Sequence, residues 1–160
     1  MSELDEVSIS PALWKKPFLS HWLPLILWMG VIFYLSDQDK NQTVQTSGFV
    51  LWLLSFLPLD PEWLTSPAFK VFVRKSAHMT EYFFLYLWAF RLLNWYQPFQ
   101  IAWSWAAFLS IAYAMTDEFH QTFVPGRGAS IRDVGVDSLG VCLGMIIIWV
   151  FLRPSRAKIT

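Results

Sequence analysis

The chain has 160 residues, enough for one domain, and 55% of them are hydrophobic whereas only 15% are charged. Soluble domains carry about 25% charged residues, so this composition predicts a protein whose main solvent is lipid. The 12 basic and 12 acidic residues balance, which argues against a nucleic-acid-binding surface, and a single cysteine excludes an internal disulfide.

The first apolar stretch covers residues 18–35. Its length is close to the roughly 20 residues that a helix needs to cross the hydrocarbon of a bilayer. It is too long for a signal-peptide core and no small-residue cleavage site follows, so we expect a retained transmembrane helix. The polar segment 36–67 contains one apolar island, 49–57, which is too short to span. We expect this island to lie in the interface or to re-enter the membrane.

Three further spans are predicted over residues 77–96, 99–116 and 134–152, the first of them as the deep part of a helix that begins near Ala68. The expected fold is therefore all-α: a polytopic membrane protein with four transmembrane helices in a single domain, residues 1–160. The second and third spans are joined by so short a turn that they should pack as antiparallel neighbours.

Two glycines of the fourth span, Gly140 and Gly144, are four residues apart. Small residues at this spacing let two membrane helices approach closely, although glycine is also common in such helices by chance.

The orientation is predicted from lysine and arginine, which favour the cytoplasmic side. Counted over all loops, the two sides of the membrane carry equal numbers. When Arg74, Lys75 and Arg127 are set aside as functional residues, the count favours a multi-pass protein of the bacterial inner membrane with both termini in the cytoplasm.

Polar residues gather where the second span begins, where the third ends and where the fourth begins. Successive spans alternate in direction, so these three points must lie on the same side of the membrane. The residues concerned are Lys75, His78, Glu81, Tyr82, Asp117, Glu118, His120, Gln121, Arg127, Asp133 and Asp137. Ionisable groups near hydrocarbon cost several kcal/mol unless they are paired or hydrated, and they usually mark a functional site.

Two histidines suggest acid–base chemistry, because an imidazole exchanges a proton near neutral pH and each has carboxylates close in sequence. We therefore assign candidate catalytic roles to His78, His120, Asp117 and Glu118. Lys75 and Arg127 are candidates for holding a phosphate. The remaining candidates for substrate binding are Glu81, Tyr82, Gln121, Asp133 and Asp137. No spacing of histidines and cysteines requires a metal ion, and no cofactor is expected.

Several neighbouring residues have simpler interpretations. Tyr82 is as well explained by an anchor at the membrane interface as by a site residue. Ser130 is placed to cap the fourth helix. Phe119 and Phe123 fit a core or an aromatic belt.

The order of these residues resembles the VanZ-like family of small bacterial membrane proteins over residues 18–152. The matching motifs are Arg74-Lys75-x-x-His78-x-x-Glu81-Tyr82, Asp117-Glu118-x-His120-Gln121-x-Phe123-Val124-Pro125-Gly126-Arg127 and Asp133-x-x-x-Asp137-x-x-Gly140. The resemblance implies a multi-span helical protein of the cell envelope, in a family named for resistance to the glycopeptide teicoplanin. It implies no established reaction.

Three functions are considered, namely catalysis, binding and transport, beside a purely structural role. The polar cluster either catalyses proton transfer on a phosphate-bearing envelope lipid or lipid-linked cell-wall precursor, or binds such a molecule without chemistry. Alternatively, it is a lattice of ion pairs that joins helix ends. Transport has little support, because the first and third spans carry no charged residue deep in the membrane.

Overall fold

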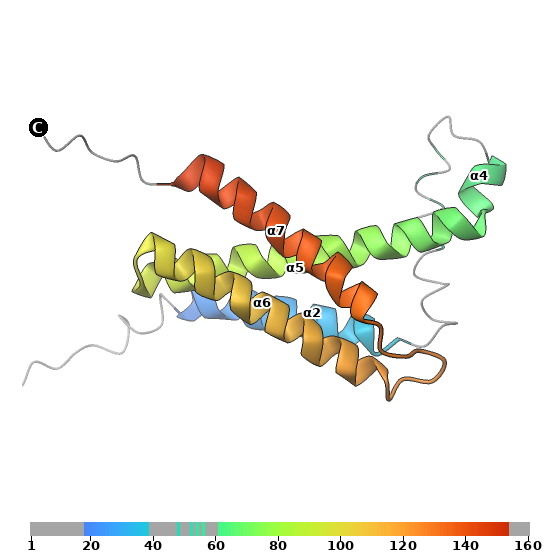
Figure 1. Ribbon diagram of the computed structural model, residues 1–160, viewed down its shortest axis with the longest axis horizontal. Helices are drawn as coiled ribbons and strands as arrows, with labels where there is room; N and C mark the ends of the chain where they lie inside the picture. Colours follow the sequence, from blue (N-terminus) through green and yellow to red (C-terminus); the bar gives the residue numbers. More distant parts are fainter. Residues whose placement is uncertain are drawn as a thin grey trace, which may run out of the picture.

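The computed structural model in Figure 1 describes residues 18–38 and 61–153, together with residues 48, 52, 54 and 56. All regular structure in these residues is helical, as the sequence predicts. The apolar island 49–57 falls largely outside the described residues, and both chain ends lie outside them, so their expected positions stay predictions.

The first long helix begins as a π-helical segment, η1 (Phe18–Trp22), and continues as α2 (Leu23–Ser36). The change of winding coincides with Pro24, whose ring removes one backbone donor from the first turn of α2. The helix closes with a hydrogen bond of 2.9 Å from Asp37 N to Phe33 O. It covers the first predicted span.

The longest helix, α5 (Pro67–Tyr96), follows the short α4 (Pro61–Thr65). Ser66 caps it by accepting a hydrogen bond of 3.2 Å from Phe69 N, and Pro67 occupies the first turn, where no backbone donor is needed. Its 30 residues make it about 45 Å long. That exceeds the roughly 30 Å of bilayer hydrocarbon, so its N-terminal turns extend beyond the neighbouring helices (Figure 1).

The remaining helices are α6 (Phe99–Gln121) and α7 (Ile131–Leu152). Both extend further into the polar cluster than predicted: α6 passes residue 116, and α7 begins before residue 134. The predicted spans followed hydrophobicity, whereas the helical hydrogen bonds continue through polar residues as well.

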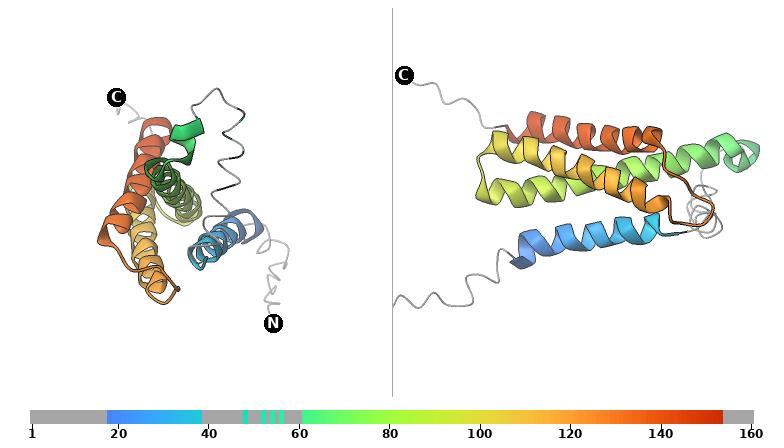
Figure 2. Two further views of the ribbon diagram at one scale, coloured as in Figure 1. Left: turned by 90° about the vertical axis from the view of Figure 1, so that its right-hand side faces the viewer. Right: turned by 60° about the horizontal axis from the view of Figure 1, so that its bottom comes forward.

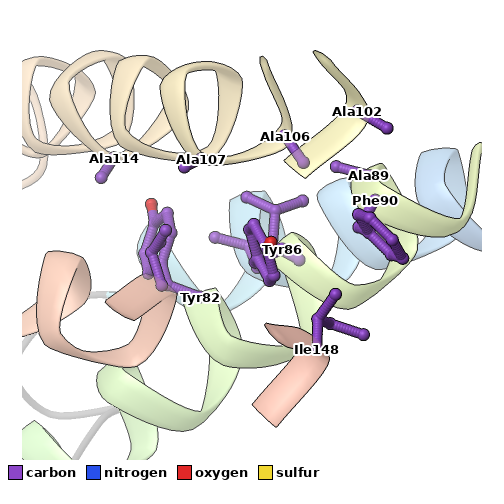
Figure 3. Packing of buried hydrophobic residues seen from close by; sticks show 12 residues of the cluster. Tyr82, Tyr86, Ala89, Phe90, Ala102, Ala106, Ala107, Ala114 and Ile148 are labelled. Carbon is purple, nitrogen blue, oxygen red and sulfur yellow. The ribbon is translucent and has the colours of Figure 1, made fainter. Parts of the chain in front are cut away.

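The core forms where α5, α6 and α7 pack together, with α2 along one side against α5 and α6 (Figure 2). Aromatic rings from α5 lie against small side chains from α6, which leave room for them (Figure 3). The rings are Tyr82, Tyr86 and Phe90, and the small residues are Ala102, Ala106, Ala107 and Ala114.

Close approach of α5 and α7 depends on the two glycines noted in the sequence. A β-carbon at Gly140 would collide with the backbone carbonyl of Met79, and one at Gly144 would lie 2.6 Å from the Tyr86 ring. The prediction of a small-residue packing face is confirmed.

Hydrogen bonds from aromatic side chains fix α2 against the other helices. The Trp28 indole donates to Glu81 O at 2.8 Å, and the Tyr113 hydroxyl donates to Met29 O at 2.9 Å. In an apolar medium such bonds tie one helix to the backbone of the next without adding charge.

Two helical stretches, Phe18–Ser36 and Ile131–Leu152, are long and apolar enough to cross a membrane. Large apolar side chains such as Leu27 and Phe151 are exposed on their outer faces, as expected for contact with lipid. Of the four predicted spans, α5 and α6 do not reach the same hydropathy, so their crossing stays a prediction.

Candidate functional site

The polar residues lie toward one end of the bundle, where α2 and α6 end and α5 and α7 begin (Figures 1 and 2). Every carboxylate of the described residues belongs to this half of the molecule: Asp37, Glu62, Glu81, Asp117, Glu118, Asp133 and Asp137. Near the opposite ends of the helices, the described charges are the basic residues Arg91 and Arg153.

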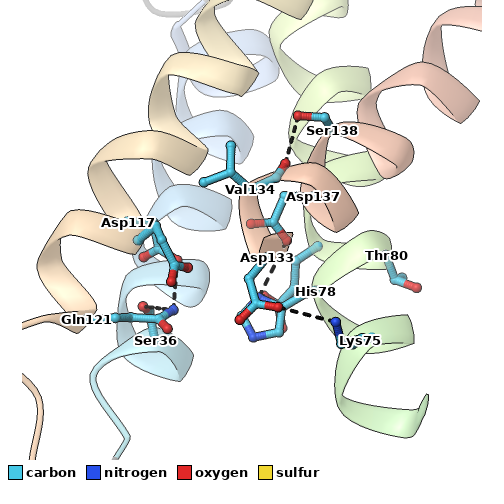
Figure 4. Close-up of polar contacts among 12 residues, drawn as sticks. Ser36, Lys75, His78, Thr80, Asp117, Gln121, Asp133, Val134, Asp137 and Ser138 are labelled. Atoms are coloured by element: carbon cyan, nitrogen blue, oxygen red, sulfur yellow. Dashed lines mark hydrogen bonds and ion pairs between the residues drawn. The ribbon is translucent and has the colours of Figure 1, made fainter. Parts of the chain in front are cut away.

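On the α5–α7 side, two layers of polar contacts follow one another along the helices (Figure 4). In the outer layer, Lys75 Nζ lies 3.4 Å from Asp133 Oδ1. One turn deeper, His78 Nδ1 lies 3.6 Å from Asp137 Oδ1 and 3.9 Å from Glu81 Oε2. The imidazole is therefore placed between two carboxylates, one from its own helix and one from α7.

On the α2–α6 side, Gln121 connects two helices (Figure 4). Its amide nitrogen donates to Ser36 Oγ at 2.9 Å and to Asp117 Oδ2 at 3.3 Å, and all three side chains are buried. The backbone carbonyl of Ser36 also accepts a hydrogen bond of 3.1 Å from Arg127 Nη1. The end of α2 thus contacts both α6 and the loop that follows it.

His120 is oriented by a carboxylate that the sequence analysis did not consider. Its Nε2 lies 3.2 Å from Asp37 Oδ1, and its ring packs on Phe33 with centroids 4.7 Å apart. Asp117 is engaged by Gln121 instead, so closeness in sequence did not identify the partner of His120. Ser36 and Asp37 were both missed. The available signal was their position at the end of the first span, on the same membrane side as the other polar residues.

Glu118 holds the loop between α6 and α7, because its carboxylate accepts a hydrogen bond from the backbone N–H of Ser130. Ser130 occupies the N-cap position of α7, as the sequence predicts, although its side chain makes no capping hydrogen bond. Within the loop, Gly126 has φ of 78°, a conformation that favours glycine.

Arg127 stands between the two sides of the cluster. Burial lowers the pKa of its guanidinium and the nearby Arg74 adds to this effect, whereas Asp117, Glu118 and Glu81 act in the opposite direction. These carboxylates come from α6 and α5. The loop therefore brings one arginine within electrostatic range of both sides.

Tyr82 is completely buried, which excludes the alternative of an anchor at the membrane interface. Phe119 and Phe123 are exposed and pack edge to face, as residues of an aromatic belt would. Among the described residues, no three histidines, cysteines, aspartates or glutamates stand close enough together to hold a metal ion.

An all-helical bundle with helices apolar enough to cross a bilayer and ionisable residues gathered at one end has the form of a polytopic membrane protein. The chain belongs to the VanZ/LLP1 family, which matches residues 21–152 and so includes all four long helices. VanZ is linked in general to teicoplanin resistance, and no substrate follows from the match. No curated protein and no solved structure matches the chain.

Proposed function

We propose that α2, α5, α6 and α7 all cross the bacterial inner membrane, with the polar end outside and both termini in the cytoplasm. The charges described near the opposite ends of the helices support this orientation, because Arg91 and Arg153 are basic and basic residues favour the cytoplasmic side. In this orientation the polar cluster lies at the outer membrane face.

We propose further that this cluster binds a phosphate-bearing envelope lipid or lipid-linked cell-wall precursor. The observation that carries the proposal is the convergence of Lys75, His78 and Arg127 from two separate segments onto one group of carboxylates at the end of the bundle. The planar guanidinium and the lysine ammonium are the groups that proteins use to hold phosphate oxygens.

Catalysis at the same site is favoured by His78. His78 Nδ1 faces Asp137 and Glu81 beyond hydrogen-bond distance, so both carboxylates lie near an imidazole that could exchange a proton with a bound ligand. Binding and catalysis therefore use the same residues. They differ in whether the bound ligand is chemically changed.

Replacing Lys75 with glutamine tests the phosphate site against a purely structural cluster. The ion pair with Asp133 is partly exposed, with 39% and 32% of the side chains accessible. Its loss should therefore cost at most about 1 kcal/mol of stability. If Lys75 holds phosphate, affinity of the detergent-solubilised protein for a short-chain phospholipid should fall about tenfold or more.

The matched control is Lys70→Gln, which removes an exposed charge of the same helix. If the Lys75→Gln variant binds phospholipid as tightly as the parent, Lys75 does not hold the phosphate. Failure of the parent to bind any phosphate-bearing headgroup would overturn the proposed function.

Replacing His78 with glutamine separates catalysis from binding. A catalytic imidazole predicts that the variant retains ligand affinity but loses the envelope phenotype of the parent, such as altered glycopeptide tolerance. Parallel loss of affinity and phenotype would indicate binding alone. Protein level and melting temperature are measured alongside, because a phenotype that follows protein level would point to the structural alternative.

A further inference from the structure

The charges of the site do not suit a simple phosphate. The site contains six carboxylates, those of Asp37, Glu81, Asp117, Glu118, Asp133 and Asp137. Its lysines and arginines are Arg74, Lys75, Arg127 and Arg132. The carboxylates therefore outnumber the lysines and arginines. A phosphate would add further negative charge to this excess, and in a partly desolvated site that repulsion is weakly screened.

Three buried oxygen atoms lie deeper than the lysine. Tyr82, Asp117 and Asp137 are 0%, 5% and 1% exposed, and they come from α5, α6 and α7. Within the described part of the chain, the Tyr82 hydroxyl, Asp117 Oδ1 and Asp137 Oδ1 have no hydrogen-bond partner, and neither does His78 Nδ1, which lies 3.6 Å from Asp137 Oδ1. Buried polar atoms are nearly always partnered, so three at one place point to a group that the protein itself does not supply. We call these three residues the inner subsite.

The three side chains face a common region between the helices. Figure 3 shows the Tyr82 hydroxyl directed toward α6. The hydroxyl interacts with the Asp117 carboxylate of that helix, but the two groups are too far apart for a regular hydrogen bond. Asp137 is near enough to both for their charges to interact. Gln121 occupies only the other oxygen of Asp117. The inner subsite therefore offers three oxygens, two of them from carboxylates.

Building on the proposed function, we propose that the ligand is a phosphate ester that also carries a protonated primary amine. Lys75 and Arg127 would hold its phosphate, and the inner subsite would accept its ammonium group. A primary ammonium has three N–H donors and one positive charge. It therefore satisfies all three oxygens and offsets the excess of carboxylates, whereas a hydroxyl has one donor and no charge.

The test compares ligands that differ only in the amine. Binding to the full chain in detergent micelles is measured at pH 7 for O-phosphoethanolamine against ethyl phosphate, and for short-chain phosphatidylethanolamine against phosphatidylethanol. We expect the amine-bearing member to bind about tenfold more tightly or better, because hydrogen bonds between charged groups are the strong ones. If only the lipid pair shows tighter binding of the amine-bearing member, the ligand is a lipid headgroup. If both pairs show it, a free phosphate ester is enough for recognition.

Substitutions that barely change side-chain shape test whether the inner subsite binds the ammonium group of the ligand. Asp137→Asn and Asp117→Asn should each abolish the preference, measured as the ratio of the two affinities within each pair of ligands. Tyr82→Phe should weaken the preference several-fold, and Glu62→Gln, which neutralises an exposed carboxylate on α4, should have no effect. If one of the variants at Tyr82, Asp117 and Asp137 fails to fold, the other two still test the inner subsite.

The outcomes separate this inference from the proposed function. Equal affinities within both pairs would overturn the amine while leaving phosphate binding intact. A preference that persists in both aspartate variants would overturn the inner subsite. Absence of binding to all four ligands would overturn the proposed function and this inference together.

Discussion

Ser36 contributes two acceptors to the site, although it lies at the end of a helix with few other polar residues. Its hydroxyl accepts from Gln121 and its carbonyl accepts from Arg127. The next residue, Asp37, faces His120. The last turn of α2 therefore fixes residues of α6 and of the following loop.

The Asp37–His120 pair can be tested with a double-mutant cycle using Asp37→Ala, His120→Ala and the combined variant. The pair is partly exposed, with 62% and 31% of the side chains accessible. We therefore expect a coupling energy of about 0.2–1 kcal/mol in unfolding experiments. If Asp37 acts only by orienting His120, the double variant should show the same phenotype as His120→Ala. An additional loss in the double variant would show that Asp37 acts independently.

At the scale of elements, the contact between α5 and α7 sets the spacing of the polar layers. Gly140 brings α7 onto the backbone of α5 at Met79, next to His78 and one turn beyond Asp137. With a larger residue, the two helices would separate, and the distance between the imidazole and its carboxylate would increase. The glycine contact is thus part of the geometry of the site.

Alanine substitutions at two glycines of α7 should have opposite effects. Gly140→Ala introduces a clash with a backbone carbonyl, so we expect a loss of about 1–3 kcal/mol in the free energy of unfolding. Gly135→Ala is the matched control, because a β-carbon there meets nothing within 4 Å. It should be neutral or stabilise the helix by up to about 1 kcal/mol. Equal melting temperatures for the two variants would contradict the close packing of α5 and α7.

At the scale of the whole molecule, charge is distributed unevenly along the helix axes. The described carboxylates belong to one half, and the described charges near the opposite helix ends are arginines. Arg153 also packs over the Trp149 ring at 4.5 Å, a pairing suited to a membrane boundary. This asymmetry is the basis for placing the polar site outside the cell.

Cysteine labelling tests this topology at two loop positions in a Cys142→Ala background. Gln97 and Ala129 are both exposed and lie at opposite ends of α6. In intact cells, an impermeant thiol reagent should label Ala129→Cys and leave Gln97→Cys unlabelled until the membrane is permeabilised. The reverse pattern would show that the protein has the opposite orientation in the membrane. Labelling at both positions would contradict a crossing by α6.

Local features of the sequence determined the elements. The apolar lengths and the short turn between the second and third spans identified the four long helices to within a few residues at most ends. The alternation of spans also placed the polar motifs together, because antiparallel helices bring the ends and beginnings of successive spans to the same side.

Only the tertiary structure decided which polar atoms meet. Helix rotation and spacing direct His78 toward Asp137, engage Asp117 with Gln121 and leave His120 to Asp37, which is 83 residues away in the chain. Helical periodicity fixes the faces of one helix but not the rotation of one helix against another. That rotation depends on side-chain packing, here on Gly140 against Met79 and on the aromatic rings of α5 against the alanines of α6.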